Sequence, residues 1–214
     1  LAPVGPGWET VLAAAVAGRA GLKRSFLDRS GWEGAAVTAL AGDASGRRYD
    51  RVTRGGHAAV LMDAPPGCGD DTAAFVAIAR HLAGLGLSPP MILAEEAREG
   101  FLLLEDLGDA LFARLLADEP WREAELYAAA AGLLAELHRH PPPRGLPRLD
   151  AATMPEAASP AFDWYAAHAG AILSPAARTA LTEALGEALD RLSPVDRPVL
   201  VLRDYHAENL IWLP

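Results

Sequence analysis

The spacing of apolar residues divides the chain into a strand-rich part and a helix-rich part. In residues 35–105, short apolar runs alternate with turn sequences, and one longer run has the apolar spacing of a helix. The predicted order is strands at 35–40, 47–53 and 57–62, a helix at 71–86, and strands at 91–93 and 101–105. Arg54-Gly55-Gly56 predicts a hairpin turn between the second and third strands.

Helical spacing dominates on both sides of this region. Before the strands, residues 8–20 and 22–30 predict two short helices separated by Gly21. After residue 106, the predicted elements are helices at 111–116, 121–138, 162–173 and 175–192, and strands at 198–202 and 210–213. The pattern therefore predicts an α/β (α+β) protein with a β-rich region followed by a helical one.

Composition narrows the class of protein. The 214 residues suffice for one large domain or two lobes. A net charge of −9 without a Lys/Arg run argues against a nucleic-acid partner, and we expect no membrane span because no run of about 18 apolar residues occurs. The single cysteine, Cys68, excludes an intrachain disulfide and fits a reducing cytoplasm. Because the chain starts at Leu1 and stops at Pro214 directly after an apolar run, we expect a fragment of a longer open reading frame.

The polar stretch near the C-terminus has the spacing of a kinase catalytic loop. Arg203 precedes Asp204, and Asn209 follows five positions later, as in the pattern H-R-D-x-x-x-x-N. Such a loop needs a carboxylate to orient the attacking hydroxyl, here Asp204, and an amide oxygen for Mg²⁺, here Asn209. Arg203 and His206 would position the loop or contact the substrate. The alternative is a polar hairpin whose Asp and Asn side chains make turn hydrogen bonds.

An earlier turn, between the first two predicted strands, is a candidate phosphate-binding loop. Its residues are Gly42, Asp43, Ala44, Ser45, Gly46, Arg47 and Arg48. Backbone N–H groups of such a turn can bind phosphate oxygens, and two arginines can neutralise their charge. The alternative is an ordinary hairpin turn with two solvated arginines. The chain contains neither a G-x-x-x-x-G-K-[ST] loop nor a G-x-G-x-x-G loop.

The run that ends the strand-rich region is the third candidate. Residues 101–104 are apolar and lead into Glu105, Asp106 and Leu107. In a two-lobed kinase this is the position of the hinge, whose backbone groups bind adenine. The alternative is a strand end with solvated carboxylates. The order of the three candidates along the chain matches the order that a kinase requires.

These segments resemble a known superfamily. Residues 40–49, 60–66, 101–109 and 203–213 are similar to the aminoglycoside phosphotransferase/choline kinase superfamily, and most to its bacterial N-acetylmuramate and N-acetylglucosamine anomeric kinases of cell-wall recycling. The resemblance implies a protein-kinase-like two-lobed fold. Its parts would be a linker or N-terminal helical extension at 1–30, an N-lobe at 31–105 and an incomplete helical C-lobe at 106–214. Some of these kinases are fused behind a tRNA-threonylcarbamoylation ATPase domain, which would explain residues 1–30 as a linker.

The resemblance also implies ATP and Mg²⁺ as cofactors and an amino sugar as the substrate. Asp204 would be the catalytic base and Asn209 a metal ligand, Gly42–Arg48 would cover the phosphates, and Glu105–Leu107 would hold adenine. The acceptor would be the anomeric hydroxyl. Two alternatives stay open, namely an aminoglycoside or choline-type kinase of the same fold, and a pseudokinase-like module that binds nucleotide without turnover.

Three departures from the superfamily pattern matter. Met62 stands where most kinases have a strand lysine, and the only lysine of the chain is Lys23. Gly46 replaces an aromatic residue usual in the anomeric kinases. The second Mg²⁺-binding Asp, which normally follows the catalytic loop, is absent. We therefore expect the chain by itself to be inactive or nearly so.

Overall fold

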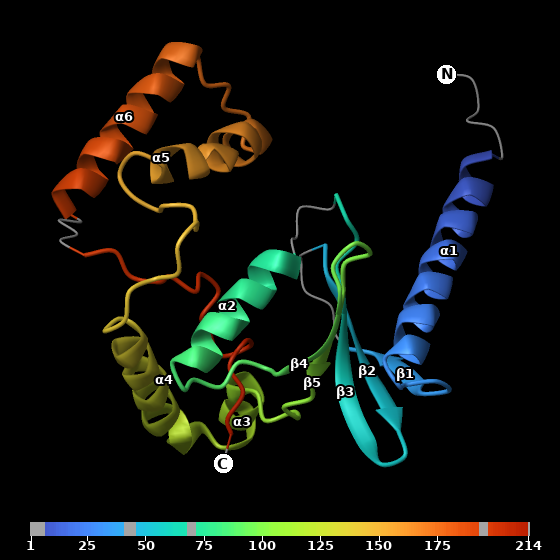
Figure 1. Ribbon diagram of the computed structural model, residues 1–214. Coiled ribbons are helices and arrows are strands. Elements are labelled where there is room, and N and C mark those ends of the chain that lie inside the picture. The colour runs from blue at the N-terminus through green and yellow to red at the C-terminus, as the bar shows by residue number, and fades with distance from the viewer. Residues whose placement is uncertain (1–6, 41–45, 68–71, 193–196, 214) are drawn as a thin grey trace. The chain divides into compact units, whose positions relative to one another are not determined.

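The computed structural model describes residues 7–40, 46–67, 72–192 and 197–213, and the side chains from Val16 onward (Figure 1). The chain divides into two compact units. The first comprises Leu1–Ala129 and Asp204–Pro214, and the second comprises Ala130–Arg203. Among the described residues, every helix is too short or too polar to cross a membrane.

The first unit is built on a five-stranded antiparallel sheet with the order β1-β2-β3-β5-β4. Its strands are β1 (Ala36–Ala39), β2 (Arg48–Arg54), β3 (His57–Asp63), β4 (Ile92–Glu96) and β5 (Phe101–Glu105), and helix α2 (Thr72–Gly84) lies between β3 and β4 in sequence. The predicted β-β-β-α-β-β order is confirmed, with bounds that differ by a few residues. The sheet and helices also confirm the predicted mixed α/β class.

Strands β3 and β5 form the centre of the sheet and are buried on both faces. On one face, Leu61 and Leu103 pack in a cluster that also includes residues of α1. On the other face, Met62 and Leu102 pack against Val76 of α2. Met62 is fully buried, so the position of the usual strand lysine belongs here to the hydrophobic core.

Gly100 fixes the end of β3 against the start of β5. Its φ is +72°, and a Cβ atom at this position would lie 1.9 Å from the carbonyl oxygen of Ala64. The Ala64 N–H also donates a hydrogen bond of 2.9 Å to the Gly100 carbonyl. Only glycine meets both the positive φ and the close approach.

The N-terminal region forms one continuous helix, α1 (Gly7–Arg29), rather than two helices separated by Gly21. An interior glycine costs a helix about 1 kcal/mol relative to alanine. The last turns of α1 bury Phe26 and Leu27 in the sheet core, and each such burial stabilises by roughly 1.5–3 kcal/mol. The gain from packing therefore exceeds the cost of Gly21, and the helix continues through it.

Ion pairs between α1 and the sheet accompany this apolar contact. Arg19 donates hydrogen bonds of 2.6 and 3.0 Å to Asp63, and its guanidinium lies 3.9 Å from the ring centroid of Phe101. Lys23 donates a 2.6 Å hydrogen bond to Asp50 and lies 3.4 Å from Asp63. Asp63 is nearly buried, with 4% of its side chain exposed. The cations of α1 thus balance the negative charge of Asp63 and Asp50 in the sheet.

The remainder of the first unit continues from β5 into short helices. Helix α3 (Phe112–Asp118) and the 3-10 turn η1 (Pro120–Arg122) lead to α4 (Glu123–Leu137), which begins in the first unit and continues into the second. The Leu126 side chain on the first turns of α4 is fully buried. Residues 207–212 return to pair with residues 110–113 at the start of α3.

The second unit is helical. It contains the end of α4, the short helix α5 (Met154–Ala157), the π-helical turn η2 (Ala161–Ala166) and α6 (Pro175–Leu192). Arg178 of α6 pairs with Asp163 of η2. The helix predicted at 162–173 is shorter than expected, because its π-helical turn soon reaches Gly170, whose φ is +77°.

The two strands predicted near the C-terminus are wrong. Residues 198–202 form no strand, and the carbonyl of Leu200 lies 3.2 Å from the ring Nε2 of His138 at the end of α4. In the run 210–213, only Ile211 makes an isolated antiparallel bridge, to Leu111. A short apolar run signals burial, but a strand also needs a backbone partner along its length.

We predict that Lys23→Met lowers the unfolding free energy by about 1–3 kcal/mol, because it removes the ammonium group that pairs with the buried carboxylate of Asp50. Urea denaturation of the variant and the parent measures the difference. Arg24→Met is the matched control, since Arg24 is exposed on the same helix. Equal losses in the two variants would contradict a specific role for the Lys23 ion pairs.

Candidate functional site

The loop that contains Asp204 and Asn209 is anchored to the start of α3 and to the residues directly before it. The Ala113 N–H donates to the Ala207 carbonyl at 3.0 Å, and the Phe112 N–H donates to the Leu210 carbonyl at 2.9 Å. The Trp212 N–H donates to the Ala110 carbonyl at 2.8 Å. These backbone bonds replace the predicted strands as the means of holding the loop at its C-terminal end.

The Asn209 side chain is hydrogen-bonded to Asp204, the other end of the Asp-x-x-x-x-Asn spacing. Its side-chain Nδ2 donates a 2.9 Å hydrogen bond to the Asp204 carbonyl, and its backbone N–H donates to the His206 carbonyl at 2.9 Å. The five-residue separation is thereby folded into a tight turn. Since Nδ2 is directed at the backbone, Oδ1 is the atom of the amide that can act as an acceptor for a cation.

His206 is exposed, and its ring contacts two later residues of the same turn. Its Nδ1 accepts a hydrogen bond of 3.3 Å from the Glu208 N–H, and its Nε2 lies 3.2 Å from Nδ2 of Asn209. The imidazole therefore lies against the amide that would bind a metal. This contact favours the loop-positioning alternative among the roles considered for His206.

Backbone strain immediately precedes Asp204. Arg203 has a φ of +61°, in the left-handed region, where a residue with a Cβ atom costs roughly 1–2 kcal/mol. Such conformations are concentrated at functional sites. Tyr205, on the other side of Asp204, is partly buried, and this burial raises the pKa of its phenol. Asp204 itself is exposed to solvent.

The candidate phosphate-binding loop is described only at its C-terminal end. Gly42, Asp43, Ala44 and Ser45 lie outside the described residues. Arg47 is half-buried, and Arg48 begins β2, opposite Asp63 of β3. Strand β2 therefore fixes the position of Arg48 relative to the sheet, and Arg47 directly precedes the strand.

The third candidate, Glu105–Leu107, begins a stretch that we call the hinge segment, residues 105–109. The Glu105 N–H donates to the Met91 carbonyl at 2.8 Å, and the Glu105 carboxylate accepts a 3.1 Å hydrogen bond from the Met91 N–H. Asp106 accepts a 3.0 Å hydrogen bond from the Gly108 N–H. Both carboxylates thus bind protein groups and shape the segment.

Sequence reasoning missed Arg51, which connects β2 to the hinge segment. Its Nε and Nη2 atoms donate to Asp106 at 2.6 and 3.0 Å, and its Nη1 and Nη2 atoms donate to Asp109 at 2.9 and 3.0 Å. The hydrogen bonds that Arg51 donates to Asp109 and Asp106 raise the pKa of its guanidinium. The signal available in the sequence was weak, because it consisted of one arginine and two aspartates more than 50 positions apart.

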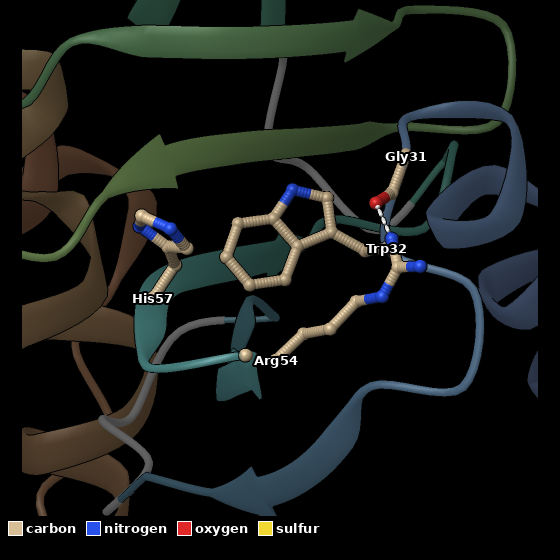
Figure 2. A pocket seen from close by; sticks show the side chains of 5 residues that line it. Gly31, Trp32, Arg54 and His57 are labelled. Carbon is tan, nitrogen blue, oxygen red and sulfur yellow. Dashed lines mark hydrogen bonds between the residues drawn. The ribbon is translucent and has the colours of Figure 1, made fainter.

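A pocket at the other end of β2 is separate from these candidates. It is lined by Gly31, Trp32, Arg54, Gly55 and His57, and Figure 2 shows the side chains of Trp32, Arg54 and His57 around it. Arg54 donates a hydrogen bond to the Gly31 carbonyl. Arg48 and Arg54 are the two ends of β2, about 20 Å apart along an extended strand. The pocket is therefore not part of the candidate phosphate loop.

A closed metal cage is not found in the described part of the chain, where no three His, Cys, Asp or Glu side chains are grouped to hold a metal ion. The residues do fit partial coordination of Mg²⁺, which prefers oxygen ligands and commonly keeps waters and substrate phosphates in its shell. Asn209 offers one such oxygen next to the backbone of Asp204.

We expect the Arg51–Asp109 ion pair to persist down to about pH 4. The hydrogen bond from Arg51 holds the pKa of Asp109 below its ordinary value of 3.8. A carboxylate with a lowered pKa contributes stability above its unfolded pKa, and the contribution is lost as the pH falls through the folded pKa. An NMR titration of the Asp109 carboxyl checks this. Arg51→Met should return its pKa toward 3.8, and an unchanged pKa would contradict the assignment.

Comparison with known proteins finds relatives that share one name. The chain is 35% identical over 231 aligned positions to a protein of Caulobacter vibrioides named N-acetylmuramate/N-acetylglucosamine kinase, with 92% of this chain and 63% of that protein covered. Proteins of the same name from Pseudomonas putida and Pseudomonas aeruginosa are 33% and 37% identical, with 82% and 79% of this chain covered. The two alignments cover 51% and 49% of those relatives. The chain therefore spans between about half and just under two thirds of the length of these relatives.

The family assignment rests on most of the chain. Residues 36–214 match the family described as the phosphotransferase enzyme family, and the match includes the sheet, the hinge segment and the loop of Asp204 and Asn209. The chain belongs to the phosphotransferase enzyme family.

Proposed function

We propose that the protein transfers the γ-phosphoryl group of ATP to a hydroxyl group of an amino sugar. The observation that carries this proposal is the hydrogen bond from Asn209 Nδ2 to the Asp204 carbonyl, which folds the two residues of the kinase spacing into one turn. The family match and the names of the three relatives support the same reaction. The acceptor that we propose is the anomeric hydroxyl of N-acetylmuramate or N-acetylglucosamine.

Asp204 is proposed as the catalytic base. Its carboxylate is exposed, so a substrate hydroxyl can approach it. A catalytic base needs this access, because it must accept or orient the proton of the attacking hydroxyl. Asn209 is proposed as a Mg²⁺ ligand through Oδ1, and Mg²⁺ would neutralise the charge that develops on the phosphates. Arg203 and His206 are proposed to hold the loop in the conformation that these roles require.

The nucleotide is proposed to bind between the hinge segment and β2. The carboxylates of Glu105 and Asp106 bind protein groups, and the Glu105 N–H donates to the Met91 carbonyl. Adenine recognition is therefore proposed for the other backbone groups of Glu105–Leu107. Arg47, Arg48 and the backbone of Gly42–Ser45 are proposed to bind the phosphates. In this proposal residues 31–105 are the nucleotide-binding lobe and the residues from 106 onward belong to the substrate-binding lobe.

The proposed substrate carries a biological role with it. Phosphorylation at the anomeric position would return sugars released from the cell wall to metabolism, so we assign the protein to cell-wall recycling in the cytoplasm. An aminoglycoside or choline as acceptor is the first alternative within the same family.

One observation favours a second function, namely nucleotide binding without turnover. Position 62 of β3 holds a methionine that is fully buried in the hydrophobic core. The strand therefore offers no lysine side chain to the phosphates. The arginines at the start of β2 would have to supply the charge, and the pseudokinase alternative requires that they do not suffice for catalysis.

We predict that Asp204→Asn, made in the protein expressed from its complete open reading frame, lowers kcat by roughly 10²–10⁴-fold, because the amide cannot accept the hydroxyl proton. ATP turnover is measured with N-acetylmuramate, N-acetylglucosamine and kanamycin in parallel. Asp118→Asn, an exposed carboxylate at the end of α3, is the control and should keep the parental rate. Turnover with kanamycin alone would replace the substrate, and ATP binding without turnover on any acceptor would favour the pseudokinase.

We predict that Asn209→Ala raises the Mg²⁺ concentration for half-maximal activity by roughly 10–100-fold, since it removes an oxygen ligand. Activity is titrated with Mg²⁺ at saturating ATP and sugar. Because the same change removes the hydrogen bond to Asp204, Asn209→Asp serves as the comparison that keeps an oxygen ligand. A parental Mg²⁺ dependence in Asn209→Ala would remove this residue from the metal site.

A further inference from the structure

The Arg51 guanidinium joins two segments that the proposed function uses separately. Arg51 lies in β2, three residues after Arg48, and its four hydrogen bonds reach the two aspartates of the hinge segment, Asp106 and Asp109. Paired arrangements of this kind between a guanidinium and a carboxylate restrict direction as well as distance. We call this group of three side chains the Arg51 clamp.

The Arg51 clamp lies on the α2 face of the sheet. Side chains alternate along a strand, and Val52, the next residue, is buried in the cluster on the α1 face. Tyr49, two positions before Arg51, packs in the cluster on the α2 face. In the register, Arg51 is opposite Val60, and Val60 is opposite Leu104 at the end of β5. The guanidinium therefore extends across this face toward the residues that follow β5.

The two arms of the clamp differ in their surroundings. The Asp106 side chain is 9% exposed and the Asp109 side chain is 57% exposed, whereas that of Arg51 is 25% exposed. Arg114 of α3 also pairs with Asp109, at 3.4 Å. The inner arm to Asp106 is the more shielded from solvent and therefore fixes the geometry, while the outer arm to Asp109 is open to screening by salt.

The clamp is also connected to the catalytic loop. Asp109 directly precedes Ala110, whose carbonyl accepts a hydrogen bond from the Trp212 N–H. The next residues, Leu111 and Phe112, pair with Ile211 and Leu210. A chain of contacts thus leads from β2 through the hinge segment to the end of the loop that contains Asn209.

We propose that Arg51 is a positioning residue for nucleotide binding, which holds β2 and its phosphate-binding arginines at a defined distance from the hinge segment that binds the base. This inference rests on the proposed function. Arg48 and Arg51 are separated by three residues of extended strand, roughly 10 Å, so the strand transmits the position of the clamp to the phosphate site. A displacement of about 1 Å at a reacting group can cost about 100-fold in rate.

The first test compares Arg51→Lys and Arg51→Met in the protein expressed from its complete open reading frame. Both are expected to raise the KM for ATP about tenfold while the KM for the sugar changes little, because lysine keeps the charge but cannot bind two carboxylates as a planar guanidinium does. Arg54→Lys is the matched control, since Arg54 lies in the same strand and binds the Gly31 carbonyl at the other end. An unchanged KM for ATP in both Arg51 variants would overturn the proposal.

The second test separates positioning from folding. Binding of a non-hydrolysable ATP analogue with Mg²⁺ is measured by calorimetry, and thermal unfolding is followed in the same samples. Arg51→Met, Asp106→Asn and the double variant form a cycle, in which we expect the double variant to bind the analogue about as weakly as either single variant. Losses of affinity that multiply in the double variant would overturn the clamp.

The readout by affinity also distinguishes this inference from the proposed function. A parent protein that binds the analogue but phosphorylates no sugar would refute the proposed reaction, while the ratio of affinities between parent and Arg51→Lys would still decide the role of the clamp. A parent protein that fails to bind the analogue would overturn both. Weaker analogue binding that follows a lower melting temperature in every variant, Arg54→Lys included, would reduce Arg51 to a structural residue.

Discussion

The antiparallel pairing of β3 with β5 is the contact on which the rest of the first unit depends. Leu61 and Met62 on β3 are opposite Leu103 and Leu102 on β5, and all four side chains are buried. Because both faces of these strands are covered, a charged side chain in their middle would lose its hydration. The burial explains why a methionine is accommodated at the position of the usual strand lysine. The same pairing delivers the end of β5 to the hinge segment.

Charged side chains connect this apolar centre to the elements around it, on both faces of one strand. Asp50 and Arg51 are consecutive residues of β2 and therefore point to opposite faces. Asp50 binds Lys23 of α1, whereas Arg51 binds Asp106 and Asp109. Strand β2 thus holds the N-terminal helix on one face and the hinge segment on the other, and it begins at the arginines proposed to bind phosphate.

In the first unit, the sequence predicted those elements well in which apolar and polar residues follow the period of a strand or of a helix. The strands 47–53 and 57–62 and the helix 71–86 were predicted from such patterns, and the structure confirms them. The predictions at Gly21 and at 198–202 were wrong for a common reason. A glycine in a helix and a short apolar run each carry a small local preference, and the burial of Phe26 and the absence of a described strand partner for 198–202 outweigh it.

The sequence by itself determined the β-β-β-α-β-β order of the strand-rich region and the spacing from Asp204 to Asn209, because these depend on residues that are near each other in the chain. The structure decided that Lys23 pairs with Asp50, 27 positions away, and that Arg51 pairs with Asp106 and Asp109, 55 and 58 positions away. It also decided the anchoring of the loop of Asp204 and Asn209 to the start of α3. Such partners are chosen by the packing of strands and helices in space. The order of charged residues along the chain does not reveal which carboxylate pairs with a given cation, since many carboxylates in the chain could form the same ion pair.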